Sequence, residues 1–455
     1  MTVPQINFNL EISSKRCKFK HEIDVITSRA KAEMNRATSK NRGTAMRKIL
    51  LVLAMTSMSF SEAVADPVAE VTHWWTSPGE SRAVGVLAGA YRARGGNWID
   101  SAVAGGANAR AVAYNRIIGG NPPTASQFTA GNEMNSMVEQ GLLRDVTPLI
   151  NEFGYDKILT PVLARAVLRD GRYYGLPVSM QVQNVFFYSL PVMNASGVNV
   201  DTLTDWPSFF AALDKVKAAG YVPLAFGADP ALLRHLFSVV LMQAGGKDLY
   251  TNVLGDNYQA ALSSPEFIKV AEYYLRLRAY TDEGAENRAW NIATNMIIKG
   301  QAGFQIIGDF AKGEIVNAGM KPGIDVGCFS GPGQRIYQIG SDVFVFPLVK
   351  DANHQQGQAL LVKTLLEPKV QLDFAKAKGG LPIAKDFDVS QLDACARKMF
   401  PAVLASENQV PAPAQLVSPD VWGAVTDTLV QVWSNPASTA GDLSKQLISA
   451  IELAR

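Results

Sequence analysis

The 455-residue sequence has little histidine and lacks the short motifs that accompany most enzyme chemistry. His73, His235 and His354 lie far apart, and none has the Glu-x-x-His or His-x-x-x-His spacing of a metal site. There is no Gly-x-x-x-x-Gly-Lys phosphate loop, and Gly327-Cys-Phe-Ser-Gly331 is not a Gly-x-Ser-x-Gly nucleophile elbow. We therefore expect no metal, no cofactor and no covalent chemistry.

Charged residues are also scarce, at 18% of the chain, and the small positive excess is confined to the N-terminus. Residues 1–65 hold 11 of the 43 basic residues but only 5 of the 41 acidic ones, so residues 66–455 carry a net charge of −4. This balance gives no reason to expect a nucleic acid or an acidic lipid as a partner.

Long apolar runs are absent, and the run Ile49–Met55 is too short to cross a bilayer. It follows the basic start Met46-Arg-Lys48 and precedes the small-residue site Ala63-Val-Ala65, which together are typical of a secretory signal peptide at 46–65, cleaved after Ala65. Residues 1–45 are polar and have no sustained apolar period. We predict that Met46 is the true start and that 1–45 is a non-native upstream extension; a structured N-terminal arm is the alternative.

Only three cysteines occur, and Cys17 lies in the predicted leader. Export would leave Cys328 and Cys395 as an even pair in an oxidising compartment, where disulfides persist. We therefore expect a Cys328–Cys395 disulfide, with two free buried thiols as the alternative.

The sequence does contain a regular alternation of strand and helix patterns, which predicts an α/β protein whose parallel strands are covered on both faces. At 455 residues the chain is long enough for two or three compact units. The expected strands and helices of the first series are strand 70–75, helix 81–94, strand 98–104, helix 108–118, strand 124–128 and helix 129–141.

Trp74 and Trp75 end the first expected strand, ahead of a Pro-Gly turn and Glu80. Neighbouring side chains of a strand point to opposite faces, so the two indoles share a surface only beyond its end. Indoles beside a carboxylate form a platform for a sugar ring, although two core tryptophans are the simpler reading. Ligands of parallel sheets bind at the carboxyl ends of the strands, where these residues and Gln127 fall, and this favours a binding site.

Six motifs together carry a family resemblance. They are His73-Trp-Trp-Thr-Ser77, Gly119-Gly-Asn-Pro-Pro123, Trp290-Asn, Ile307-Gly-Asp-Phe-Ala-Lys-Gly-Glu314, Lys378-Gly-Gly-Leu-Pro382 and Asp393-Ala-Cys-Ala396. Through them residues 66–455 resemble the extracellular solute-binding proteins of ABC sugar transporters, in particular the glucose/mannose-binding branch of the carbohydrate-binding family.

The resemblance implies a two-lobe periplasmic-binding-protein-like fold. Each lobe is a mostly parallel sheet flanked by helices, hinge strands join the lobes, and the ligand binds in the cleft between them. Applied to this chain, lobe one comprises 66–178 and 310–365, and lobe two comprises 179–309 and 366–455. The resemblance also implies that Cys328 and Cys395 are bridged.

The resemblance further implies a set of ligand-binding residues. Trp74, Trp75 and Glu80 would approach the sugar from lobe one, Asp309 and Lys312 would lie near the hinge, and Lys378 would reach in from a later loop. Weaker correspondences are Asn184, Trp290 and Asp342. The structural alternatives are a helix N-cap for Asp309 and solvated side chains for Lys312 and Lys378.

Three positions depart from the glucose-binding pattern. Relatives carry a lysine where this chain has Thr129, a histidine where it has Gln181, and another histidine near Pro413. Each unmatched polar group in a hydrogen-bonded site costs about 1–3 kcal/mol, enough to change which sugar binds. We therefore expect a mono- or short oligosaccharide and do not assign glucose.

The sequence thus predicts a monomeric periplasmic protein that closes on a sugar and delivers it to a membrane ABC permease. Two alternatives are kept. An exported glycoside hydrolase would use Glu80 and Asp309 as its paired carboxylates. A sugar sensor would present its closed form to a chemoreceptor.

Overall fold

The computed structural model describes residues 67–129, 131–154, 159–384 and 387–455, and residues 66–455 form one compact unit. The predicted signal peptide, the upstream extension and the cleavage site lie outside the described residues and stay predictions. Within the described residues, no helix is both long enough and apolar enough to cross a bilayer.

The first sheet has five strands in the order β2-β1-β3-β13-β6. β1 pairs in parallel with β2 and β3, as the sequence predicts, whereas β13 runs antiparallel to β3 and β6. The bounds are β1 (Val68–His73), β2 (Asn97–Ala102), β3 (Ala125–Thr129), β6 (Gly175–Pro177) and β13 (Asp342–Val345).

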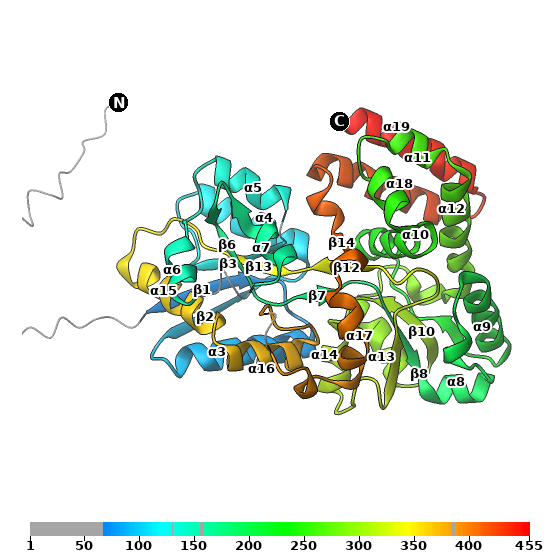
Figure 1. Ribbon diagram of the computed structural model, residues 1–455, viewed down its shortest axis with the longest axis horizontal. Helices are drawn as coiled ribbons and strands as arrows, with labels where there is room; N and C mark the ends of the chain where they lie inside the picture. The colour runs from blue at the N-terminus through cyan, green and yellow to red at the C-terminus, as the bar shows by residue number, and fades with distance from the viewer. Residues whose placement is uncertain (1–66, 130, 155–158, 385–386) are drawn as a thin grey trace, which may run out of the picture. The chain divides into compact units, whose positions relative to one another are not determined.

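Helices cover both faces of the first sheet, with α3, α15 and α16 on one side and α4, α5 and α7 on the other (Figure 1). The bounds are α3 (Pro78–Arg92), α4 (Gly106–Ile118), α5 (Asn132–Glu139), α6 (Thr147–Glu152), α7 (Pro161–Val167), α15 (Ala352–Leu365) and α16 (Pro368–Lys378).

The start of α3 corrects the sequence reading of Pro78-Gly79 as a separate turn. Ser77 is the N-cap and forms a capping box with Glu80, so Pro78 and Gly79 make the first helical turn. A Cβ on Gly79 would lie 2.6 Å from the backbone carbon of Gly313, so glycine allows α14 (Ala311–Asn317) to approach closely.

The second sheet has four strands in the order β11-β8-β10-β9, and β10 is buried along its whole length. Its strands are β8 (Val185–Ser189), β9 (Val222–Leu224), β10 (Ala302–Ile307) and β11 (Val326–Phe329). Its helices and those that follow are α8 (Leu190–Ser196), α9 (Trp206–Ala218), α10 (Pro230–Val253), α11 (Tyr258–Leu262), α12 (Pro265–Leu277), α13 (Trp290–Ile298), α17 (Ala394–Leu404), α18 (Pro419–Ser434) and α19 (Ala440–Ala454).

A three-stranded sheet, β14-β12-β7, lies beside these two sheets (Figure 1). It consists of β7 (Gln181–Val182), β12 (Tyr337–Gly340) and β14 (Gln409–Pro411), and a two-stranded ribbon pairs β4 (Leu168–Arg169) with β5 (Arg172–Tyr173). Short 3-10 helices are η1 (Val200–Thr202), η2 (Arg278–Tyr280), η3 (Glu283–Ala285), η4 (Val389–Gln391), η5 (Ser406–Asn408) and η6 (Pro413–Gln415).

Two segments pack with a different sheet from the one that the predicted lobe boundaries assign them to. β11, expected in lobe one, hydrogen-bonds to β8 of the second sheet. α16, expected in lobe two, packs against α3 beside the first sheet. The predicted disulfide is confirmed: Cys328 on β11 is bonded to Cys395 on α17.

Candidate ligand-binding site

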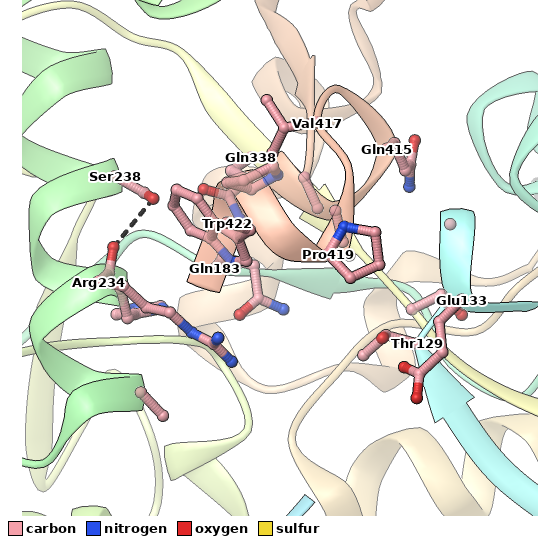
Figure 2. A pocket seen from close by; sticks show the side chains of 18 of the residues that line it. Thr129, Glu133, Gln183, Arg234, Ser238, Gln338, Gln415, Val417, Pro419 and Trp422 are labelled. Atoms are coloured by element: carbon pink, nitrogen blue, oxygen red, sulfur yellow. Dashed lines mark hydrogen bonds between the residues drawn. The ribbon is translucent and has the colours of Figure 1, made fainter. Parts of the chain in front are cut away.

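A cavity of about 490 Å³ lies among segments that are far apart in the sequence (Figure 2). One wall comes from the ends of β1 and β3 and from α4 and α5, and another comes from α10 and the start of α18. Strands β7 and β12 supply the residues between them. The lining residues are Trp74, Arg110, Thr129, Gly131, Glu133, Gln181, Gln183, Ala231, Arg234, His235, Ser238, Gln338, Gly340, Ser341, Asp342, Ala412, Pro413, Ala414, Gln415, Val417, Ser418, Pro419, Trp422 and Gly423.

Trp74 follows the last residue of β1 and lines this cavity. Its backbone N–H donates to Gln127 Oε1 at 3.0 Å, which fixes the loop to the neighbouring strand β3. The Arg110 guanidinium lies 5.6 Å from the centre of the indole, and Arg110 Nε is 2.8 Å from Glu133 Oε2. The cation–π contact and the ion pair together orient the indole in the cavity wall.

Trp75 lies in the core, so the expectation that both indoles are open at a crevice is wrong for this residue. Its side chain is 1% exposed and packs against Phe344 and Phe374, with ring centroids 5.6 and 5.4 Å away. Its Nε1–H donates to Asp342 Oδ2 at 3.3 Å, so the polar edge of the ring is also used inside the protein.

Asp342 joins this core to the cavity. Gln181 Nε2 donates to Asp342 Oδ2 at 2.7 Å, and Thr129 stands opposite Asp342 in the β3–β13 pairing. Burial raises the pKa of the Asp342 carboxyl, while the Lys378 charge and the amide hydrogen bonds oppose that rise. Trp74, Thr129, Gln181 and Asp342 are therefore the predicted site residues that the structure brings together at the cavity.

Amide side chains on or next to β7 and β12 form the wall between the segments that carry Trp74 and Trp422. Gln183 donates to Gln181 Oε1 at 3.2 Å, and the buried Oε1 atom of Gln338 has no hydrogen-bond partner within the described residues. His235 Nε2 is likewise without a partner there, and burial lowers the pKa of His235 to about 4. These groups are uncharged at neutral pH and can both donate to and accept from hydroxyl groups.

Sequence reasoning missed Arg110, Arg234 and Trp422. Arg234 and Trp422 come from α10 and α18, which lie outside the first series of strands and helices from which the sequence analysis inferred the site. One signal was present: Arg234-His235 are adjacent ionisable residues inside a strongly apolar helix. Such residues are seldom buried without a partner or a function.

Four other predicted residues form a buried ionic cluster instead of lining the cavity: Glu80, Asp309, Lys312 and Lys378. Lys378 Nζ lies 3.1 Å from Glu80 Oε1, and Lys312 Nζ lies 3.0 Å from Asp393 Oδ2. The expectation of solvated lysines is wrong, since both are almost fully buried. Asp309 is not an N-cap, because Phe310 occupies that position in α14.

The remaining predicted residues have partners within the protein. Asn184 donates to Ile336 O at 2.7 Å and accepts from Gln338 N at 3.0 Å, which ties β8 to β12. Trp290 packs edge-on against Phe310 at 5.0 Å, and its carbonyl accepts from Gln305. Gln127 does not line the cavity, but its Oε1 atom accepts a hydrogen bond from the Trp74 backbone N–H. Among the described residues, no group of three or more His, Cys, Asp or Glu could hold a metal ion.

Residues 97–372 match the family model described as bacterial extracellular solute-binding protein. The chain belongs to this family. Among relatives of this solute-binding protein, one from Mesorhizobium japonicum is 34% identical over 78% of this chain and 85% of its own. Another, from Brucella melitensis, is 30% identical over 85% of this chain and 92% of its own. Both are named "probable sugar-binding periplasmic protein".

Solved structures show the same fold. A bacterial solute receptor described as having an exclusive preference for β-D-galactopyranose superimposes with a TM-score of 0.73. The alignment covers 86% of this solute-binding protein and 99% of the receptor at 19% identity. The two-lobe α/β fold of the family is therefore the fold of this chain.

Proposed function

We propose that this protein is a periplasmic receptor that binds a mono- or short oligosaccharide and delivers it to a membrane ABC permease. Family membership supports the solute-binding role, and the names of the two relatives support a sugar as the solute. We also propose that the protein acts as a monomer and performs no covalent chemistry; a chemoreceptor partner stays a prediction.

One observation carries the choice of ligand. Trp74 and Trp422, from opposite ends of the chain, are both partly buried and line one cavity together with a wall of glutamine side chains. Indole faces cover the C–H surface of a sugar, while amides match hydroxyl groups that are donors and acceptors at once. The volume of about 490 Å³ lies in the range of small-molecule sites.

Within this proposal, Trp74 and Trp422 stack on the sugar, and Thr129, Gln181 and Asp342 read its hydroxyl groups. Glu80, Asp309, Lys312 and Lys378 hold α3, α14 and α16 together next to the site. The alternative of a glycoside hydrolase receives no support, since Glu80 is paired with Lys378 and neither Glu80 nor Asp309 lines the cavity.

A thermal-shift screen against mono- and oligosaccharides tests the proposal. A ligand at 100 times its Kd stabilises the folded state by about 2.7 kcal/mol, which gives a measurable rise in Tm. The wild type should respond, and the Trp74→Ala and Trp422→Ala variants should respond less at equal sugar concentration. Release of reducing ends during incubation, or no response to any sugar, would contradict the proposal.

A further inference from the structure

The cavity contains a guanidinium group that has no ionic partner within the described part of the chain. Arg234 extends from α10 into the space faced by Gln183 and Trp422 (Figure 2). Among the described residues, no carboxylate lies within ion-pair distance of its side chain, although the side chain is partly buried. Asp229 affects the Arg234 guanidinium only as a charge at a distance. The Asp229 carboxylate accepts a hydrogen bond from Leu232 N and caps α10.

The other cation of the cavity, Arg110, repels the positive charge of Arg234. Burial lowers the pKa of Arg234, and the positive charge of Arg110 across the cavity lowers it further. Arg110 is neutralised by Glu133, so the uncompensated charge of this region belongs to Arg234. A partly buried arginine is costly without an anion, and its planar fork of donors fits a carboxylate.

An adjoining cavity of about 530 Å³ has the same sign of charge. Gly131 and Gln415 line both cavities, so the two lie next to each other. The second is lined by Arg165, Arg169 and Lys247, and none of the described residues in its lining is acidic. Neither of these arginines has an ion pair within the described part of the chain. The only interaction of the Lys247 ammonium there is a 3.3 Å hydrogen bond to Glu407 O.

We propose that the ligand is an acidic sugar whose carboxylate pairs with the Arg234 guanidinium. This inference rests on the proposed sugar-binding function and narrows its substrate class to sugars that contain uronic acid. The row of cations in the adjoining cavity binds the carboxylate of the next unit, so an acidic oligosaccharide binds more tightly than its monomer.

Calorimetric titration with matched sugar pairs tests the first contact. Glucuronate and glucose, galacturonate and galactose, and mannuronate and mannose differ at C6, where a carboxylate replaces a hydroxymethyl group. We expect at least one acid to bind about tenfold or more tightly than its neutral partner, with an affinity that falls as salt rises. If the neutral sugar of every pair binds as well or better, the inference is wrong while the sugar-binding function stands. If no sugar of either kind binds, as monosaccharide or as short oligosaccharide, both are wrong.

The Arg234→Gln variant separates this contact from general damage. It should weaken binding of the acid by about tenfold to a hundredfold and leave the neutral partner within about twofold. Arg82→Gln removes an exposed charge on α3 and should leave the affinities for the acid and for the neutral sugar unchanged. An unchanged denaturation midpoint of ligand-free Arg234→Gln shows that folding is intact. Equal weakening of acid and neutral sugar would overturn the role of Arg234.

A separate experiment tests the contact between the adjoining cavity and the carboxylate of the next sugar unit. The paired substitution Arg165→Gln with Arg169→Gln should weaken binding of a di- or trimeric uronate and leave the monomeric uronate unaffected. Equal affinity of wild-type protein for monomer and oligomer would remove the adjoining cavity from the proposal.

Discussion

The ammonium group of Lys378 lies 3.1 Å from Glu80 Oε1, and both side chains are buried. The pair joins the last residue of α16 to the first turn of α3, although 298 positions separate the two residues in the sequence. Glu80 also completes the capping box of α3, so a single carboxylate both starts a helix and anchors a second one.

Lys378→Met should destabilise the protein by about 3–5 kcal/mol, because it leaves the Glu80 carboxylate buried without its counter-charge. Urea denaturation measures this loss. Glu80→Gln added to Lys378→Met removes the stranded charge and keeps a capping residue, so the double variant should unfold at higher urea than Lys378→Met alone. A loss below about 1 kcal/mol in the single variant would show that the pair behaves like a surface salt bridge.

Substitutions of the adjacent residues Trp74 and Trp75 should affect different properties, sugar binding for Trp74 and folding stability for Trp75. Trp75→Ala empties a core position and should cost about 3–5 kcal/mol of unfolding free energy, read from denaturant titration. Trp74→Ala should change stability by only about 1 kcal/mol and weaken sugar binding about tenfold, read from calorimetry. If Trp74→Ala caused the large loss of stability and Trp75→Ala the loss of sugar binding, Trp75 and not Trp74 would be the indole of the site.

Asp309 should make stability depend on pH. Burial is the main cause that raises the pKa of Asp309 to about 7. Its unfolded value is near 4, so between these two pKa values the folded state binds more protons, and stability falls as pH rises. Relative to Asp309→Asn, the wild type should lose about 3 kcal/mol between pH 4 and 7. Parallel pH–stability curves for the two proteins would mean that Asp309 titrates normally.

Reduction of the Cys328–Cys395 disulfide should destabilise the protein by about 4 kcal/mol, since the bond closes a loop of 67 residues. Denaturation with and without reductant measures the loss. The Cys328→Ala/Cys395→Ala variant serves as the control, because reductant should leave its midpoint unchanged. A response of this variant to reductant would show that the effect does not come from the disulfide.

Local patterns were enough to predict the first part of the fold. The order of strands and helices around Trp74 predicted a parallel arrangement, which β1, β2 and β3 adopt. Local patterns did not reveal that β11 joins β8 or that α16 packs on α3, because such pairings depend on contacts between distant segments.

The candidate site was predicted only in part for the same reason. The position of Trp74 followed from where its strand ends, and Trp74 does follow β1 and line the cavity; its contact with a sugar stays a prediction. Local patterns do not reveal that Lys378 meets Glu80 or that Lys312 meets Asp393, so these buried charges looked like ligand contacts. Arg234 was overlooked because its helix reads as apolar, although a buried cation in such a helix is itself unusual.

The cavity is assembled from both ends of the chain, because Trp74 follows the first strand and Trp422 lies on the penultimate helix. A polypeptide still being synthesised therefore has no complete binding pocket until residues 412–423 have emerged and folded. Ligand titration consequently counts only fully matured molecules, and the number of sites per chain gives a direct assay of how much of a preparation is correctly folded.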